Sequence, residues 1–244
     1  MVGNRDMQEH FLRRAEAAGY EAIILTADAP VPSRRVADLR NQFSISSAPS
    51  WGSVKGYEEE LMSDPVLGKY IRGGPDKSGQ QLEEEPWSPP EFVGFTWDDI
   101  ERFRHLTDLP MIVKGVRSVE DALMCADAGF NGVTVSNHGA RHLDGTKSAI
   151  ELLPRIVDEV GHRIEVYFDS GVRTGMDVFK ALALGARAVS IGRPIFWGLA
   201  VGGESGVSRV LDLLKIELDL AMAYVGTTKI SEIDRATVDM PREW

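Results

Sequence analysis

The sequence has 244 residues, of which 43% are hydrophobic and 26% are charged, which is ordinary for one large or two small globular domains. A net charge of −10 gives no electrostatic support for nucleic-acid binding, and a single cysteine excludes an intrachain disulfide framework. No apolar run is long enough to span a bilayer.

Helical and strand patterns alternate along the chain. Thr96 and Ser118 mark helix starts and Gly19 and Gly129 mark helix ends, because these residue types favour those positions. The strand segments are short, apolar and rich in β-branched residues. In chain order, the predicted elements are helix 8–20, strand 21–30, helix 96–107, strand 110–115, helix 118–130, strand 131–137, helix 149–161, strand 164–172, helix 175–186, strand 187–194 and helix 207–224.

This alternation predicts an α/β protein with a parallel sheet that is covered by helices. A closed (β/α)₈ barrel, or TIM barrel, needs eight strands and about 250 residues, whereas this chain offers five strands. The expected fold is therefore an incomplete (β/α)₈ barrel that holds about strands 4 to 8. Residues 45–92, whose second half is rich in Gly, Pro and acidic residues, are predicted to be a long loop or insertion.

Each predicted strand turns polar at its carboxyl end. In parallel α/β folds these ends lie on one face, where active sites are built. Glycine lets a ligand approach the backbone and arginine binds phosphate through paired hydrogen bonds, so the last two loops are candidates for a phosphate site. The residues at the five strand ends are Thr26 and Asp28, then Lys114, then Ser136, His138 and Arg141, then Asp169, Gly171 and Arg173, then Gly192 and Arg193.

Some of these residues have both a functional and a structural interpretation. His138, with Arg141 nearby, is a candidate catalytic residue, because imidazole exchanges protons near neutral pH. Burial of Lys114 costs free energy without an anion, which favours an anionic cofactor or substrate, or else a salt bridge to a carboxylate. Asp28 belongs to the same face or only caps the following turn. Cys125 lies in a helix of apolar period and is predicted to belong to the core.

Five stretches carry a family resemblance: "LTADAP", "PMIVKGV", "GVTVSNHGARHLDG", "VYFDSGVRTGMDVFKALALGARAVSIGRP" and "GVSRVLDLLKIELDLAMAYVGTTKISEI". Together they resemble the FMN-dependent α-hydroxy acid oxidases and dehydrogenases, a family that includes glycolate oxidase, lactate oxidase, mandelate dehydrogenase and flavocytochrome b2. The resemblance covers nearly the whole chain apart from the segment at 45–92. The combination of "SNHGAR", "DSGVR" and "GRP" is highly specific, whereas each motif alone is weak.

The resemblance implies an FMN-binding (β/α)₈ barrel and a role for each matching residue. His138 matches the catalytic base, and Asp28 matches the carboxylate that pairs with it. Arg141 and Arg35 match the two arginines that bind the substrate carboxylate. The residues that match flavin contacts are Thr26, Lys114, Ser136, Asp169, Ser170, Gly171, Val172, Arg173, Gly192 and Arg193. No metal site is expected.

The implied reaction is the FMN-dependent oxidation of an L-2-hydroxy acid to a 2-oxo acid. The particular acid stays open, and the electron acceptor is oxygen, a cytochrome or a quinone. A homo-oligomer and an intracellular location, in the cytoplasm, a peroxisome or a mitochondrion, are expected. Two alternatives remain: an inactive or weakly flavin-binding fragment of such an enzyme, and another FMN barrel such as type 2 isopentenyl diphosphate isomerase.

The chain also departs from the family pattern. The three barrel strands that precede the "LTVD"-type strand in the family have no counterpart, so residues 1–244 are interpreted as a single FMN-dependent hydroxy acid dehydrogenase domain that is truncated at its N-terminus. Unpaired sheet edges predict that such a chain is poorly stable alone or associates with itself or a complementary piece. Ser170 stands where the family has glycine, in "DSGVR" instead of "DGGVR".

Overall fold

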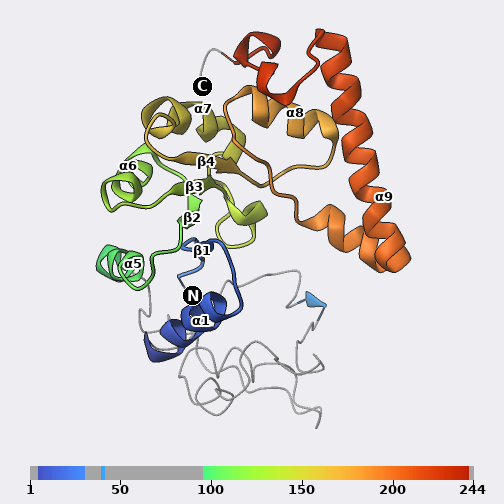
Figure 1. Ribbon diagram of the computed structural model, residues 1–244. Coiled ribbons are helices and arrows are strands. Elements are labelled where there is room, and N and C mark those ends of the chain that lie inside the picture. The colour runs from blue at the N-terminus through green and yellow to red at the C-terminus, as the bar shows by residue number, and fades with distance from the viewer. Residues whose placement is uncertain (1–4, 31–39, 42–95, 242–244) are drawn as a thin grey trace. The chain divides into compact units, whose positions relative to one another are not determined.

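The computed structural model describes residues 5–30, 40–41 and 96–241 (Figure 1). The chain forms two compact units, one made of Met1–Ile23 and Ala29–Leu109 and the other of Ile24–Asp28 and Pro110–Trp244. The predicted loop or insertion at 45–92 lies outside the described residues, and so does Arg35.

In the first unit, the structure describes two helices, α1 (Arg5–Ala17) and α5 (Trp97–Arg104), and both were predicted from the sequence. Thr96 caps α5, since its hydroxyl accepts a hydrogen bond from the backbone N–H of Asp99 at 3.4 Å. The Asp99 carboxylate in turn accepts one from the backbone N–H of Thr96 at 3.2 Å. This reciprocal pair fixes the first turn of the helix.

Apolar side chains from both helices form the interior of the first unit, where Leu12, Ile100 and Phe103 are buried. The hydroxyl of Thr107 donates a hydrogen bond to Glu16 Oε1 at 2.5 Å and so ties α1 to the segment that follows α5. This hydrogen bond is the main reason why the pKa of Glu16 lies below its usual value.

The second unit is built on a four-stranded sheet whose strands lie in chain order (Figure 1). β2 pairs with β3 in parallel, and β3 pairs with β4 in parallel. The pairing of β2 with β3 shifts register between Lys114 and Val116, so Gly115 forms an irregularity at the carboxyl end of β2. The strands are β1 (Ile23–Thr26), β2 (Met111–Val116), β3 (Gly132–Val135) and β4 (Glu165–Phe168).

The fifth predicted strand, 187–194, is much shorter than expected. Val189 forms an isolated parallel bridge with Phe168 of β4, and the neighbouring Ser190 N–H donates to the Phe168 carbonyl at 2.8 Å. The chain leaves the sheet after these contacts because Gly192 ends the extended segment and Pro194 lies in the first turn of a helix. The segment therefore has the position of a fifth strand but little of its length.

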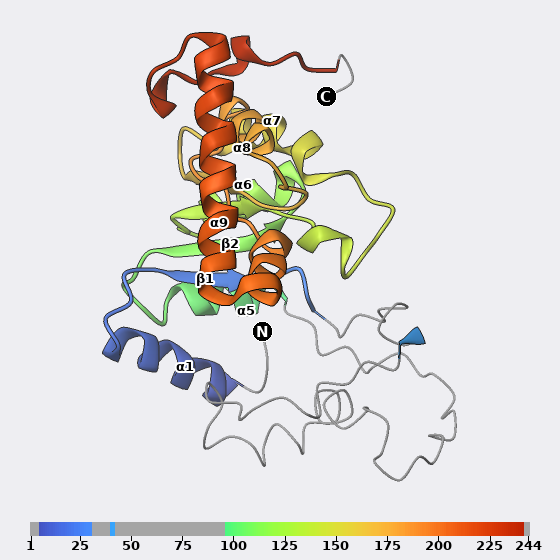
Figure 2. The same ribbon diagram turned by 90° about the vertical axis from the view of Figure 1, so that its right-hand side faces the viewer.

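Four helices follow the strands: α6 (Val119–Asp127), α7 (Ala149–Val160), α8 (Gly175–Ala183) and α9 (Arg193–Val225). α6 packs on β2 and β3, α7 packs on β3 and β4, and α8 packs along α9 (Figure 2). The helix predicted at 207–224 is thus part of a longer one that begins at Arg193. Gly202 and Gly203 break its helical geometry, and such glycine pairs allow a sharp kink.

Part of the core of the second unit lies between the sheet and the helices α6 and α7, and another part lies between α8 and α9. Met111, Val113, Val133 and Leu153 have at most 1% of their surface exposed. Cys125 is also fully buried, as predicted, and burial raises the pKa of its thiol to about 12. Of the helices in the described part of the chain, none combines the length and the apolar character that a membrane crossing requires.

Candidate active site

Polar side chains converge at the carboxyl ends of the four strands of the second unit. The strands run side by side, so the residues that follow them meet at one edge of the sheet. The side chains that hydrogen bonds or ion pairs join there are those of Asp28, Lys114, Ser136, His138, Asp169 and Ser170. The sequence predicted that these residues belong to one site, and the structure brings them together.

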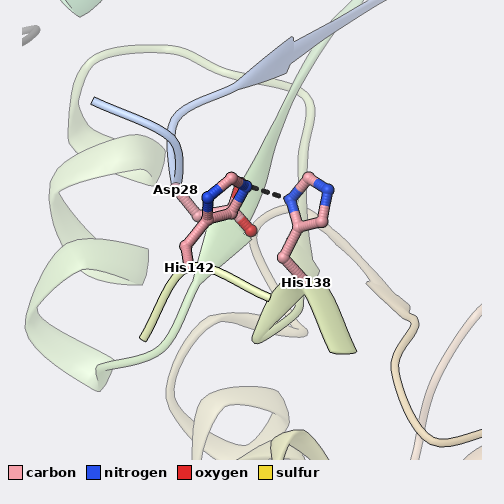
Figure 3. Close-up of side chains that lie close together, drawn as sticks. All are labelled: Asp28, His138 and His142. Atoms are coloured by element: carbon pink, nitrogen blue, oxygen red, sulfur yellow. Dashed lines mark hydrogen bonds and ion pairs between the residues drawn. The ribbon is translucent and has the colours of Figure 1, made fainter. Parts of the chain in front are cut away.

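His138 and Asp28 form the central pair of this cluster (Figure 3). His138 Nδ1 lies 3.0 Å from Asp28 Oδ1, although 110 residues separate the two in sequence. The Asp28 side chain is only 4% exposed, whereas that of His138 is 32% exposed. The carboxylate therefore orients the ring from inside the protein, and the imidazole remains open to a ligand.

Gly115 makes the position of Asp28 possible. Its φ is 106°, which only glycine adopts readily, and a Cβ at this position would lie 2.4 Å from Asp28 Cβ. The sequence contained a signal for this contact, because a glycine at the end of a strand often marks a close backbone approach. Gly115 is not among the residues predicted from the sequence, because the neighbour that it must accommodate follows a strand that is distant in the sequence.

Lys114 supplies a positive charge beside the pair. Its Nζ lies 3.2 Å from Asp169 Oδ2 and 4.0 Å from Asp28 Oδ2, and it donates a hydrogen bond to Ser136 Oγ at 3.3 Å. Its side chain is 22% exposed, so part of the ammonium group still faces outward. The salt bridge to a carboxylate, which was one of the two interpretations of Lys114, is thus present. An anionic ligand could also interact with the exposed part of the Lys114 ammonium group.

His142 extends the cluster beside His138 (Figure 3). The two rings meet edge to face, with centroids 4.4 Å apart. One ligand atom each of Asp28, His138 and His142 can be chosen so that all three lie within 4.8 Å of one another, which is a set of donors that transition metals accept. The ammonium group of Lys114, 4.0 Å from the same Asp28, opposes a further cation there.

Two glycine-containing loops border the cluster. The loop after β4 contains Gly171, with φ of 81°, and the buried Val172, and Arg173 stacks on the ring of Trp197 at 5.1 Å. Arg193 opens α9, and its Nη2 donates to the carbonyl of Gly139 at 2.9 Å. The Arg193 guanidinium therefore lies beside the turn that carries His138, and the Arg173 guanidinium lies against Trp197 of α9.

For the other predicted residues, the structure gives a position along the chain and a degree of exposure. Thr26 is the last residue of β1 and is half-buried, and Arg141 is exposed three residues after His138. Gly192 is exposed and precedes α9. Arg35 lies outside the described residues, so the pair of arginines predicted for a substrate carboxylate is represented by Arg141 alone.

Comparisons with known proteins point to flavin-dependent enzymes. A family model described as FMN-dependent dehydrogenase matches residues 1–240. 2-Hydroxyacid oxidase 1 of Mus musculus is 41% identical over 235 residues, and L-lactate oxidase of a Nostoc species is 40% identical over 237 residues. A solved structure of mandelate oxidase is 38% identical and superimposes with a TM-score of 0.74.

These matches cover nearly all of this chain but only part of each relative. They include 96%, 95% and 96% of this chain, respectively, and 61%, 60% and 60% of the three relatives. The chain thus spans about three fifths of the length of these proteins. The structural likeness and the parallel sheet with its helices show the predicted fold, part of a (β/α)₈ barrel with four strands in the described sheet.

Proposed function

Because the chain belongs to the FMN-dependent dehydrogenase family, we propose that it binds FMN and oxidises an L-2-hydroxy acid to the 2-oxo acid. The observation that carries this proposal is the pairing of His138 with the buried Asp28, next to Lys114, at the carboxyl ends of the strands. The relatives named above as 2-hydroxyacid, L-lactate and mandelate oxidases support the same substrate class.

The residues at the two bordering loops fit an anionic cofactor such as FMN. A Cβ built on Gly171 or Gly192 would meet open space, so a ligand can approach the backbone there. Arg173 and Arg193 provide cations for a phosphate group in a chain whose net charge is −10. We propose that Thr26, Lys114, Ser136, the loop at 169–173 and Gly192–Arg193 hold FMN. When bound, FMN supplies the acceptor of two electrons.

The chain's own residues account for the movement of the proton. As the substrate is oxidised, His138 accepts a proton through the ring nitrogen that faces away from Asp28. Protonated imidazole is then stabilised by the Asp28 carboxylate, which already lies 3.0 Å from Nδ1. Arg141 and Arg35 are the proposed partners of the substrate carboxylate, since a guanidinium group binds a carboxylate through two parallel hydrogen bonds.

The proposal also includes molecular oxygen as the final electron acceptor. The relatives are named oxidases, which favours molecular oxygen over a cytochrome or a quinone. With oxygen, each turnover converts one 2-hydroxy acid and one O₂ into one 2-oxo acid and one H₂O₂. Production of H₂O₂ in proportion to 2-oxo acid would support oxygen, whereas turnover only with a cytochrome or quinone would contradict it.

The main test is anaerobic reduction of bound flavin. The purified chain is mixed with FMN, and L-lactate or glycolate is added while the visible flavin absorbance is recorded. The proposal expects FMN to bind and its absorbance to bleach, and expects His138→Ala to slow the bleaching by about 10²–10⁴-fold. His162→Ala, at an exposed histidine away from the cluster, is the matched control and should bleach as the unmodified chain does.

Each failure has a distinct meaning. If FMN does not bind, the cofactor assignment is wrong. If FMN binds but neither acid bleaches it, the chain corresponds to the inactive alternative. If a diphosphate substrate is isomerised without net oxidation, the isomerase alternative is correct.

A further inference from the structure

Ser170 has a backbone conformation that a residue with a side chain rarely adopts. It lies two residues after the end of β4, and its φ is 85°. Such a conformation persists only where surrounding contacts hold it, and it is concentrated at functional sites. The contacts of the Ser170 side chain therefore show what is gained from having serine at this position.

Protein groups fill the hydrogen-bonding capacity of the Ser170 hydroxyl. It donates to Asp169 Oδ1 at 2.7 Å and accepts from the backbone N–H groups of Asn137 at 3.2 Å and Gly139 at 3.3 Å. The Gly139 N–H is shared, because it also donates to Asn137 Oδ1 at 3.0 Å. The hydroxyl of Ser136 lies slightly farther away, at 3.5 Å. A hydroxyl has one hydrogen and two lone pairs, so the three shorter contacts leave none for a ligand.

The turn held by these contacts carries His138. The N–H of His138 donates to Ser136 Oγ at 3.1 Å, so three consecutive backbone N–H groups, those of residues 137–139, point to two serine hydroxyls. His138 and Ala140 both have positive φ, at 54° and 59°. This turn, which follows β3, thus has an unusual backbone conformation. Hydrogen bonds to a residue of the loop after β4 help to hold it.

Ser170 also connects this turn to the charged part of the cluster. Asp169 accepts the Ser170 hydrogen bond with Oδ1, and its Oδ2 lies 3.2 Å from Lys114 Nζ. A continuous series of polar contacts therefore runs from Lys114 through Asp169 and Ser170 to the backbone that carries His138. This series fixes the imidazole relative to the ammonium group.

We propose that Ser170 is a positioning residue, whose hydroxyl holds the His138 turn in the geometry that proton transfer requires. The kinetic consequence rests on the proposed function, whereas the effect on the turn depends on the structure alone. Small displacements of a reacting group cause large losses of rate, so release of the turn slows the reaction even though Ser170 touches no substrate.

Two substitutions separate the hydroxyl from the backbone conformation. Ser170→Gly removes the hydroxyl and suits a φ of 85°, whereas Ser170→Ala removes the hydroxyl and keeps the strained conformation. Ser208→Ala removes an exposed serine hydroxyl from α9 and is the matched control. If the hydroxyl acts only by supporting the fold, Ser170→Gly should lower the stability and the rate less than Ser170→Ala does.

The first measurement is amide hydrogen exchange of Asn137 and Gly139 in the full chain, without substrate. We expect the Asn137 amide to exchange about 10-fold faster in Ser170→Gly and Ser170→Ala than in the unmodified chain or Ser208→Ala. The Gly139 amide should change less, because it also donates to Asn137 Oδ1 at 3.0 Å. The melting temperature of Ser170→Gly should lie closer to that of the unmodified chain than the melting temperature of Ser170→Ala does, because glycine suits the backbone conformation.

The second measurement is anaerobic flavin reduction at saturating 2-hydroxy acid. We expect the reduction rate constant to fall about 10-fold in both variants, while the apparent affinities for the acid and for FMN change less than about threefold. A purely structural role would not produce this split between rate and affinity.

Several outcomes would overturn the positioning role. Unchanged exchange of the Asn137 amide in Ser170→Gly would do so whatever the activity. A large loss of FMN affinity with unchanged exchange would assign the hydroxyl to the cofactor instead. If exchange is faster in both variants but the chain never reduces flavin, the result supports the role of Ser170 in holding the turn. It then contradicts only the proposed function.

Discussion

The loops after β3 and β4 differ from the interior beneath them in backbone strain and in polarity. Among the described residues, those with positive φ that are not glycine are His138, Ala140 and Ser170, and all lie in these two loops. The interior consists instead of apolar side chains such as Met111 and Leu153, which are fully buried. Among the described residues, strained backbone at residues other than glycine is therefore confined to two of the loops that carry the proposed chemistry.

This difference indicates a division of roles within one unit. The interior provides stability through the burial of closely packed apolar side chains, and this stabilisation does not depend on a ligand. The loops use that stability to hold a conformation that is unfavourable by itself. Substitutions in the loops should therefore reduce the rate of reaction more than the stability, and substitutions in the interior should do the reverse.

The largest effect is expected from Asp28→Asn. The amide keeps the shape of the carboxylate but carries no negative charge to stabilise a protonated His138, so flavin reduction should slow by about 10³-fold. The matched control is Asp158→Asn, which removes the carboxylate from an exposed ion pair with Arg235 and should leave the rate unchanged. Equal rates for Asp28→Asn and the unmodified chain, measured by anaerobic stopped-flow absorbance, would show that Asp28 is only a turn cap.

The next effect is expected from Gly115→Ala, which tests the close approach of the backbone to Asp28. The new Cβ would meet Asp28 at 2.4 Å, so the carboxylate must move away from His138, and flavin reduction should slow by about 10²-fold. Gly129→Ala is the control, because its φ of 81° imposes a similar backbone cost but nothing lies within 4 Å of the new Cβ. If both variants lose stability alike and keep their rates, the contact does not matter for the site.

A substitution in the interior should show the opposite pattern. Leu153→Ala leaves a cavity under the sheet and should lower the free energy of unfolding by about 2–5 kcal/mol. The flavin reduction rate of the protein that remains folded should change by less than about threefold, since Leu153 lies in α7 and is not one of the residues of the polar cluster. Urea unfolding and anaerobic reduction on the same sample measure both quantities. If the rate falls by more than the loss of folded protein explains, the proposed distinction between the interior and the loops is wrong.

The sequence predicted much of this arrangement because its signals are local. Thr96 and Ser118 start helices through contacts within a few residues, and the polar residues after each strand converge because parallel strands share one direction. Asp28 and His138 could be assigned to one face in the same way, and the family resemblance paired them. The matches to FMN-dependent enzymes confirm that resemblance.

Other features depend on contacts that no local pattern contains. The short fifth strand and the early start of α9 at Arg193 depend on how Val189 meets β4, and the sequence signals of Pro194 and the later glycines resemble those of a loop. The role of Gly115 depends on β1 lying next to β2. The Ser170 hydroxyl could not be assigned to the His138 turn, because its donors come from another loop.

The last prediction concerns Cys125, which tests whether the interior is closed. Burial raises the pKa of its thiol to about 12, so at pH 8 the folded chain should react with iodoacetamide more than about 10³-fold slower than the chain in urea. The folded thiol keeps its proton at pH values where the unfolded thiol loses it. The free energy of unfolding should therefore fall as the pH rises from about 9 to about 12. Mass spectrometry of the alkylated chain measures the first effect, and urea unfolding across this pH range measures the second. Reaction at the unfolded rate at pH 8 would mean that the interior opens as readily as the loops, and the contrast between them would then lie only in chemistry and not in stability.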